Sequence, residues 1–169
     1  MATRYKTVVG LRRTMKKFLL RRLLPVLALG LIAIQFAHPA RNVAAAPSPD
    51  DLAIKHPMPA DVRRTLELAC YDCHSNTTRY PWYASVQPMA WWIDYHVRGG
   101  KRHLNFSQFG AYPAKNAARK LAAVVEEVQR DDMPLLSYTW LHPEARLTAE
   151  QKKQLTDWAD ALHDQIAPY

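Results

Sequence analysis

Residues 70–74 have the sequence Cys-Tyr-Asp-Cys-His and contain both cysteines of this 169-residue chain. Two thiols three positions apart can add to the two vinyl groups of a haem, and the adjacent imidazole can coordinate its iron. This spacing is therefore typical of c-type haem attachment. A haem bound in this way would form part of the hydrophobic core, because a folded body of about 110 residues buries only a modest core by itself.

The two cysteines are open to other interpretations. A redox dithiol is expected where a strand meets a helix in a βαβ unit, and the sequence shows no such unit. A zinc site needs four Cys or His ligands, and here the second pair would be His96 and His103, seven residues apart. A disulfide would close a very small loop, which constrains the unfolded chain least. The leading hypothesis is covalent haem attachment by Cys70 and Cys73, with His74 as an axial iron ligand.

The net charge of +8 is concentrated at the N-terminus. Residues 1–41 contain nine Lys and Arg and no acidic residue; taking these from the total of 23 leaves 14 basic residues against 15 acidic ones. The rest of the chain therefore has a net charge of −1. A nucleic-acid-binding protein needs a basic patch on its folded body, so this distribution argues against a nucleic-acid partner.

An apolar stretch, residues 23–36, follows the basic residues. Its length suits the apolar region of a signal peptide, whereas extension back to residue 18 gives about 20 positions, enough to span a membrane. Arg21 and Arg22 would then lie at the cytoplasmic interface, and the C-terminal portion would be exported. We therefore expect residues 1–37 to be a membrane anchor (or a signal peptide) in a bacterial inner membrane, with the C-terminal domain in the periplasm.

The rest of the chain divides into a linker and a helical domain. Residues 38–56 are rich in Pro and Ala, which predicts an extended, fairly stiff linker. Residues 57–169 show no strand alternation, and the expected domain is all-α. Four amphipathic helices are predicted, starting near Pro59, Pro88, Pro113 and Thr148. The second is expected to stop at Gly99-Gly100, and the last has a capping box completed by Gln151.

The second axial ligand of the iron decides the chemistry of such a protein. Met133 is the first choice, because the proline that follows it restrains its backbone in an irregular loop. A methionine ligand raises the reduction potential. Met89, His96 and His103 are the alternatives. An open sixth position, which would bind small ligands or peroxide, is a further possibility.

Aromatic and basic residues near the motif are candidates for the surroundings of a haem. Trp82, Tyr83, Trp91 and Trp92 would line the porphyrin and exclude water, which tunes the potential through burial. Arg79 would pair with a haem propionate, since the guanidinium group suits planar carboxylates.

Several segments beyond the motif resemble a family of bacterial haem-binding domains related to cytochrome c. The similar segments are residues 33–36, 70–76, 78–83, 91–92, 96–97, 103–107, 133–134, 137–138 and 141–145. The resemblance implies a cytochrome-c-like fold around one haem c, attached through Cys70 and Cys73 and ligated by His74. Met89 departs from the family, in which a small aliphatic residue is expected there, and this keeps Met89 open as an alternative ligand.

Together these features predict a small all-α, cytochrome-c-like domain preceded by an N-terminal transmembrane or signal-anchor helix. The predicted function is a membrane-anchored, periplasmic monohaem c-type cytochrome that passes single electrons between redox partner proteins. The alternatives are a haem-based sensor or peroxidase-like protein with an exchangeable sixth iron site, and a non-haem metal-binding or structural module. The sequence shows no phosphate-binding glycine loop and no nucleophile with its base, so an electron carrier is favoured over an enzyme.

Overall fold

The computed structural model describes the backbone of residues 2–167 and the side chains of residues 18–167. In this part of the chain no strand forms, and the prediction of an all-α protein is confirmed. The elements in chain order are α1 (Ala2–Ile34), α2 (Leu52–Lys55), α3 (Ala60–Ala69), α4 (Tyr71–His74), η1 (Trp82–Ser85), α5 (Met89–His103), η2 (Phe106–Ala111), α6 (Ala114–Gln129), α7 (Leu136–Leu141), η3 (Pro143–Ala145) and α8 (Ala149–Ile166). The elements labelled η are short 3-10 helices.

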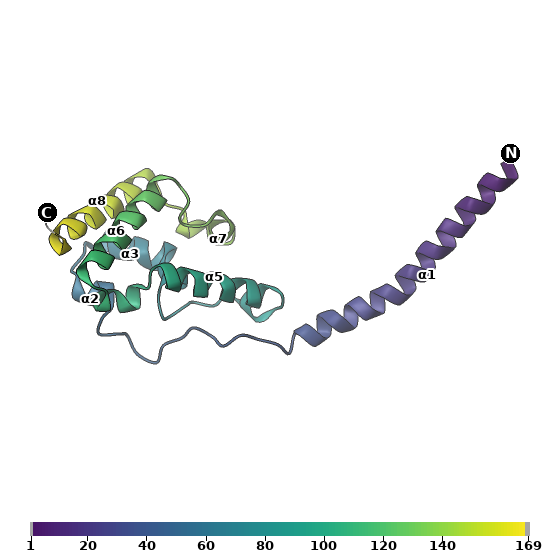
Figure 1. The fold of residues 1–169 in the computed structure, drawn as a ribbon, viewed down its shortest axis with the longest axis horizontal. Coiled ribbons are helices and arrows are strands. Elements are labelled where there is room, and N and C mark those ends of the chain that lie inside the picture. The colour runs from purple at the N-terminus through teal and green to yellow at the C-terminus, as the bar shows by residue number, and fades with distance from the viewer. Residues whose placement is uncertain (1, 168–169) are drawn as a thin grey trace. The chain divides into compact units, whose positions relative to one another are not determined.

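The chain forms two compact units. The first consists of Met1–Pro39 with Pro81–Trp92, and the second of Ala40–Tyr80 with Ile93–Tyr169. The Cys-Tyr-Asp-Cys-His motif and the hydrophobic core both belong to the second unit. Within that unit α6 and α8 lie side by side, and α3 packs against α8 (Figure 1).

Helix α1 does not have the properties predicted for the N-terminal segment. Its apolar part starts after Arg21 and Arg22, includes Pro25 and ends with the helix at Ile34. A transmembrane helix needs about 20 apolar residues, and this part is shorter. Among the described residues, no helix combines the length and the apolar character required to cross a membrane. The predicted transmembrane or signal-anchor helix is therefore wrong, and so is the predicted location at a bacterial inner membrane, which depended on it.

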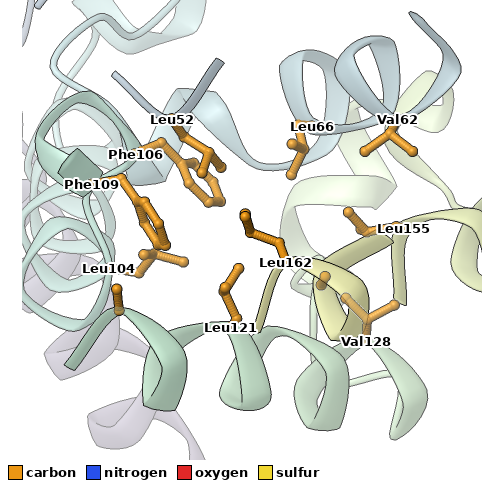
Figure 2. Packing of buried hydrophobic residues seen from close by; sticks show 12 residues of the cluster. Leu52, Val62, Leu66, Leu104, Phe106, Phe109, Leu121, Val128, Leu155 and Leu162 are labelled. Carbon is orange, nitrogen blue, oxygen red and sulfur yellow. The ribbon is translucent and has the colours of Figure 1, made fainter. Parts of the chain in front are cut away.

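The core of the second unit is built by α3, α6 and α8 together with α2 and the residues that follow α5. Figure 2 shows the side chains of this cluster pointing toward one another: Leu52, Val62, Leu66, Leu104, Phe106, Phe109, Leu121, Val128, Leu155 and Leu162. On the three long helices they recur at the spacing of one helical face. Each buried Leu or Phe contributes about 1.5–3 kcal/mol of burial free energy, so this cluster is the main source of stability.

The predicted helix starts are confirmed in the domain. The long helices α3, α5, α6 and α8 begin one residue after Pro59, Pro88, Pro113 and Thr148, and the capping box between Thr148 and Gln151 is present. The predicted end of α5 is wrong, because this helix continues through both glycines to His103. A glycine in a helix costs about 1 kcal/mol relative to alanine. Gly100 is needed there because α5 lies against the backbone of Cys73, which leaves no room for a Cβ atom.

The Pro/Ala-rich segment predicted as a linker takes part in the second unit from residue 40 onwards. Asn42 donates its side-chain amide to the backbone oxygen of Ser75 at 2.8 Å, and Val43 pairs with Thr77 in an isolated antiparallel bridge. The short helix α2 buries its leucine completely in the core. This segment therefore lies along the residues that follow the motif, instead of extending away from the domain.

Candidate functional site

Residues 70–74, called the motif segment below, lie where α3 ends and α4 begins. The backbone N–H of Cys70 donates to the carbonyl oxygen of Leu66 at 2.9 Å, and those of Cys73 and His74 donate to the Cys70 oxygen at 3.2 and 3.0 Å. Both cysteines are free thiols and partly buried. One hydrogen-bonded turn, anchored on a core helix, therefore carries both thiols and the imidazole.

The His74 ring is oriented by the backbone that follows α5. Its Nδ1 lies 3.0 Å from the carbonyl oxygen of Leu104. A carbonyl oxygen only accepts, so Nδ1 carries the hydrogen and Nε2 keeps the lone pair that a metal ion needs. Burial lowers the pKa of His74, although hydrogen bonds to the backbone of Leu104 and Gly100 act in the opposite direction. The lowered pKa favours the neutral imidazole, which is the form that coordinates iron.

Gly100 allows α5 to lie directly against the motif segment. A Cβ atom on this residue would come within 2.6 Å of the carbonyl oxygen of Cys73 and 3.3 Å of the Cys73 Cβ. The first of these distances lies well inside van der Waals contact. At Gly99 the same atom would meet only the Nη2 of Arg102, at 3.8 Å. The close approach therefore requires a glycine at position 100 and not at position 99.

Phe106 packs between the motif segment and the core. Its ring stacks on that of Tyr71, with centroids 5.1 Å apart and planes 16° apart, and its centroid lies 6.0 Å from that of the His74 ring. Phe106 is only 3% exposed, and the Tyr71 hydroxyl donates to Asp51 Oδ1 at 3.0 Å. The imidazole is thus held by a hydrogen bond and by an aromatic contact.

Amide side chains fix the residues on either side of this contact. Asn105 donates its side-chain amide to Asn76 Oδ1 at 2.9 Å, and the backbone N–H of Asn76 donates to Ser107 Oγ at 3.0 Å. Asn105 in turn accepts from the backbone N–H of Ser107 at 3.1 Å. Because Leu104 directly precedes Asn105, this network also holds the acceptor of the His74 ring in place.

Asp72, which lies between the two cysteines, is a buried charge that sequence analysis did not single out. It is 7% exposed, and its carboxylate accepts hydrogen bonds from Arg79 and from the Tyr138 hydroxyl. Arg79 is therefore engaged by Asp72, and its contact with a haem propionate stays a prediction. The only local signal was an acidic residue seven positions before an arginine. Tyr138 is 66 residues away from Asp72, a separation that no local pattern reveals.

The protein environment suppresses ionisation of the two thiols. Burial, the largest cause, raises the pKa of Cys70 to about 12 and that of Cys73 to about 11, and the neighbouring charges of Cys73 and Asp72 respectively add to this. At pH 8 the thiolate fraction of Cys73 is therefore about a hundredfold lower than in the unfolded chain. A thiolate of higher pKa is also a stronger nucleophile, which raises its reaction rate about tenfold, so the net decrease in rate is about tenfold.

We therefore expect iodoacetamide at pH 8 to alkylate Cys73 about tenfold more slowly in the folded, haem-free chain than in guanidinium-unfolded chain. Cys70 should react more slowly still, and both rates should rise as the pH approaches 11. Mass spectrometry of the alkylated peptides measures the two rates separately. Equal rates in the folded and unfolded chains would contradict the burial of the thiols.

The other predicted iron ligands are distributed over both units. Met133, His96 and His103 belong to the second unit, with the motif segment, and Met89 to the first. Met133 is partly buried, and its backbone N–H donates to the carbonyl oxygen of Glu127 at the end of α6, at 3.2 Å. Within the described residues no group of three or more His, Cys, Asp or Glu side chains could hold a metal ion. His96 and His103 therefore do not complete a zinc site with the cysteines.

The four aromatic residues predicted to surround a haem lie in the first unit. Trp82 and Tyr83 belong to η1, where their rings meet edge to face with centroids 5.8 Å apart. Trp91 and Trp92 lie in the first turn of α5. Trp82 is 81% exposed and Trp91 is 41% exposed. The assignment of all four aromatic residues to a haem pocket stays a prediction.

Two free thiols and an imidazole with an available Nε2, carried on one turn of a helical fold, are an arrangement expected of a haem-binding protein. The model of the family described as "Haem-binding domain" matches residues 29–161, which is most of the chain. The protein belongs to this family, as predicted, and haem is its cofactor. The predicted covalent attachment through Cys70 and Cys73 stays a prediction. No curated protein and no solved structure is significantly similar to the chain.

Proposed function

We propose that this protein is a c-type haem protein, in which Cys70 and Cys73 form thioether bonds to one haem and His74 binds its iron. The observation that carries the proposal is the hydrogen bond from His74 Nδ1 to the Leu104 oxygen, which leaves Nε2 for the metal. A histidine that ligates a metal almost always donates its other ring hydrogen to an acceptor of this kind. The spacing of the free thiols relative to the imidazole supports covalent attachment.

The donor atoms of the second unit fit a haem better than a bare metal ion. A haem iron would need only one nitrogen from the motif segment, because the porphyrin itself supplies four ligands, whereas zinc would need four protein ligands. The apolar contacts of Phe106 and Tyr71 beside His74 suit a large aromatic cofactor. Burial keeps both thiols un-ionised, and Cys70 packs against the hydrophobic core.

We further propose that the protein transfers single electrons to and from other redox proteins. Bound haem supplies the exchange between ferrous and ferric iron. Met133 is the proposed second axial ligand, because its thioether favours reduced iron. The backbone N–H groups of Asp132 and Met133 both donate to the Glu127 oxygen, at 3.0 and 3.2 Å, and this restrains the loop that carries the thioether.

Covalent attachment is tested by visible spectroscopy of the full chain, produced together with a haem-attachment machinery and then extracted with acidified acetone. Wild type should keep its haem, and the Cys70→Ala/Cys73→Ala double variant should lose all of it, because no thioether can form. His103→Ala, which changes an exposed histidine, should behave like wild type. Complete extraction of haem from the wild type would contradict c-type attachment.

The second axial ligand is tested in the oxidised protein through the sulfur-to-iron charge-transfer band. Met133→Ala should abolish the band and lower the reduction potential, since the thioether no longer stabilises ferrous iron. Met89→Ala is the matched control and should leave both unchanged. Rapid binding of carbon monoxide by reduced wild type would instead indicate an exchangeable sixth position, as in a sensor or peroxidase-like protein.

A further inference from the structure

The carboxylate of Asp72 is saturated with hydrogen bonds although it lies between the two thiols. Oδ1 accepts from the backbone N–H and the Nε of Arg79, both at 3.0 Å; Oδ2 accepts from Arg79 Nη2 at 3.0 Å and from the Tyr138 hydroxyl at 2.7 Å. A buried carboxylate is strongly unfavourable unless it is paired and hydrogen-bonded. Its partners are therefore held firmly, and their positions are coupled to that of the motif segment.

Tyr138 brings a distant segment into this arrangement. It lies in α7, which begins three residues after Met133, and its ring stacks on His142 with centroids 4.5 Å apart. The loop between α6 and α7 is held at its start by the bonds to the Glu127 oxygen. The hydroxyl of Tyr138, bonded to Asp72 and lying 3.3 Å from the Leu68 oxygen, holds its other end.

We propose that Asp72, Arg79 and Tyr138 form a clamp that positions the Met133 loop relative to the haem-attaching motif segment. Arg79 fixes the orientation of the Asp72 carboxylate with two guanidinium bonds and balances its charge, and the second oxygen then holds the Tyr138 hydroxyl. The inference rests on the proposed function, because it assigns the loop the task of presenting the sixth iron ligand. The three are positioning residues, which act on the iron through the loop.

The test uses the full, haem-loaded chain with the substitution Tyr138→Phe, which removes one hydroxyl and keeps the ring that stacks on His142. Covalent haem content should be unchanged. The oxidised variant should bind imidazole, which competes with the methionine, about tenfold more tightly than wild type, because the loop loses a hydrogen bond to a charged acceptor. The sulfur-to-iron band should weaken. A purely structural role would lower the unfolding midpoint and leave the imidazole affinity unchanged.

Tyr95→Phe is the matched control, because Tyr95 is 65% exposed and the same hydroxyl is removed there. It should show wild-type imidazole affinity. A double-mutant cycle with Asp72→Asn identifies the route: in that background Tyr138→Phe should change the affinity less than about twofold, because the shared bond is already weakened. Full additivity of the two substitutions would overturn the clamp. If Asp72→Asn yields no haem protein, the Tyr138→Phe result decides alone.

The outcomes separate the clamp from the function on which it rests. Haem that is extractable from wild type overturns the proposed function itself. A wild type without the sulfur-to-iron band, or a Met133→Ala variant that keeps it, overturns Met133 as ligand and the clamp with it. Covalent haem and a Met133-dependent band, together with wild-type imidazole affinity in Tyr138→Phe, overturn the clamp alone.

Discussion

The Gly100→Ala variant should lose most of its bound haem and unfold at a lower urea concentration than wild type. The added Cβ would lie 2.6 Å from the carbonyl oxygen of Cys73, a backbone atom that has no rotamer by which to move away. Either α5 or the motif segment must therefore shift. Overpacking of this kind costs about 1–3 kcal/mol, and a shift of α5 also draws the Leu104 oxygen away from His74.

The matched control is Gly99→Ala, one residue earlier in the same helix. Its Cβ would meet only the flexible end of Arg102 at 3.8 Å, and replacing a helical glycine by alanine raises stability by up to about 1 kcal/mol. The two variants should therefore shift the urea midpoint in opposite directions, and Gly99→Ala should keep its full haem content. Equal midpoints and equal haem contents would show that the close approach is not required.

The Phe106→Ala variant should have a free energy of unfolding about 3–5 kcal/mol lower than wild type, as expected for removal of a buried aromatic ring. It should also alter the haem spectrum and the reduction potential, because Phe106 contacts both Tyr71 and His74. Denaturant unfolding measures the first effect. Spectroelectrochemistry of the folded, haem-loaded protein measures the second.

Phe109→Ala separates these two effects. Phe109 is 1% exposed, as fully buried as Phe106, but its ring contacts are with His56 and Tyr112, at centroid distances of 5.7 and 5.9 Å. The loss of stability should be similar, because the same ring is removed from the same core, while the spectrum and potential stay as in wild type. Equal spectral changes in both variants would contradict a specific role of Phe106 beside His74.

Sequence patterns were most informative where the interactions are local. Helices α3, α6 and α8 begin where a proline or the Thr148 capping box predicts, because capping and helical periodicity involve residues within one or two turns. The motif predicted haem binding from local information as well, because haem attachment depends on the spacing of two cysteines and a histidine within one turn. The prediction for the N-terminal segment was wrong because its apolar stretch starts only after Arg21 and Arg22, and it reaches a membrane-spanning length only if these charged residues are included.

The amino-acid sequence alone was sufficient to identify the all-α class, the haem cofactor and the turn that carries Cys70, Cys73 and His74. The tertiary structure decided how that turn is supported: His74 bonds to a carbonyl 30 residues away, and Asp72 to a hydroxyl 66 residues away. It also decided that Gly100 is a packing residue inside α5 and not the end of the helix. These contacts arise from the packing of separate helices against one another, and residues that meet only in the folded chain leave no periodic or local signal.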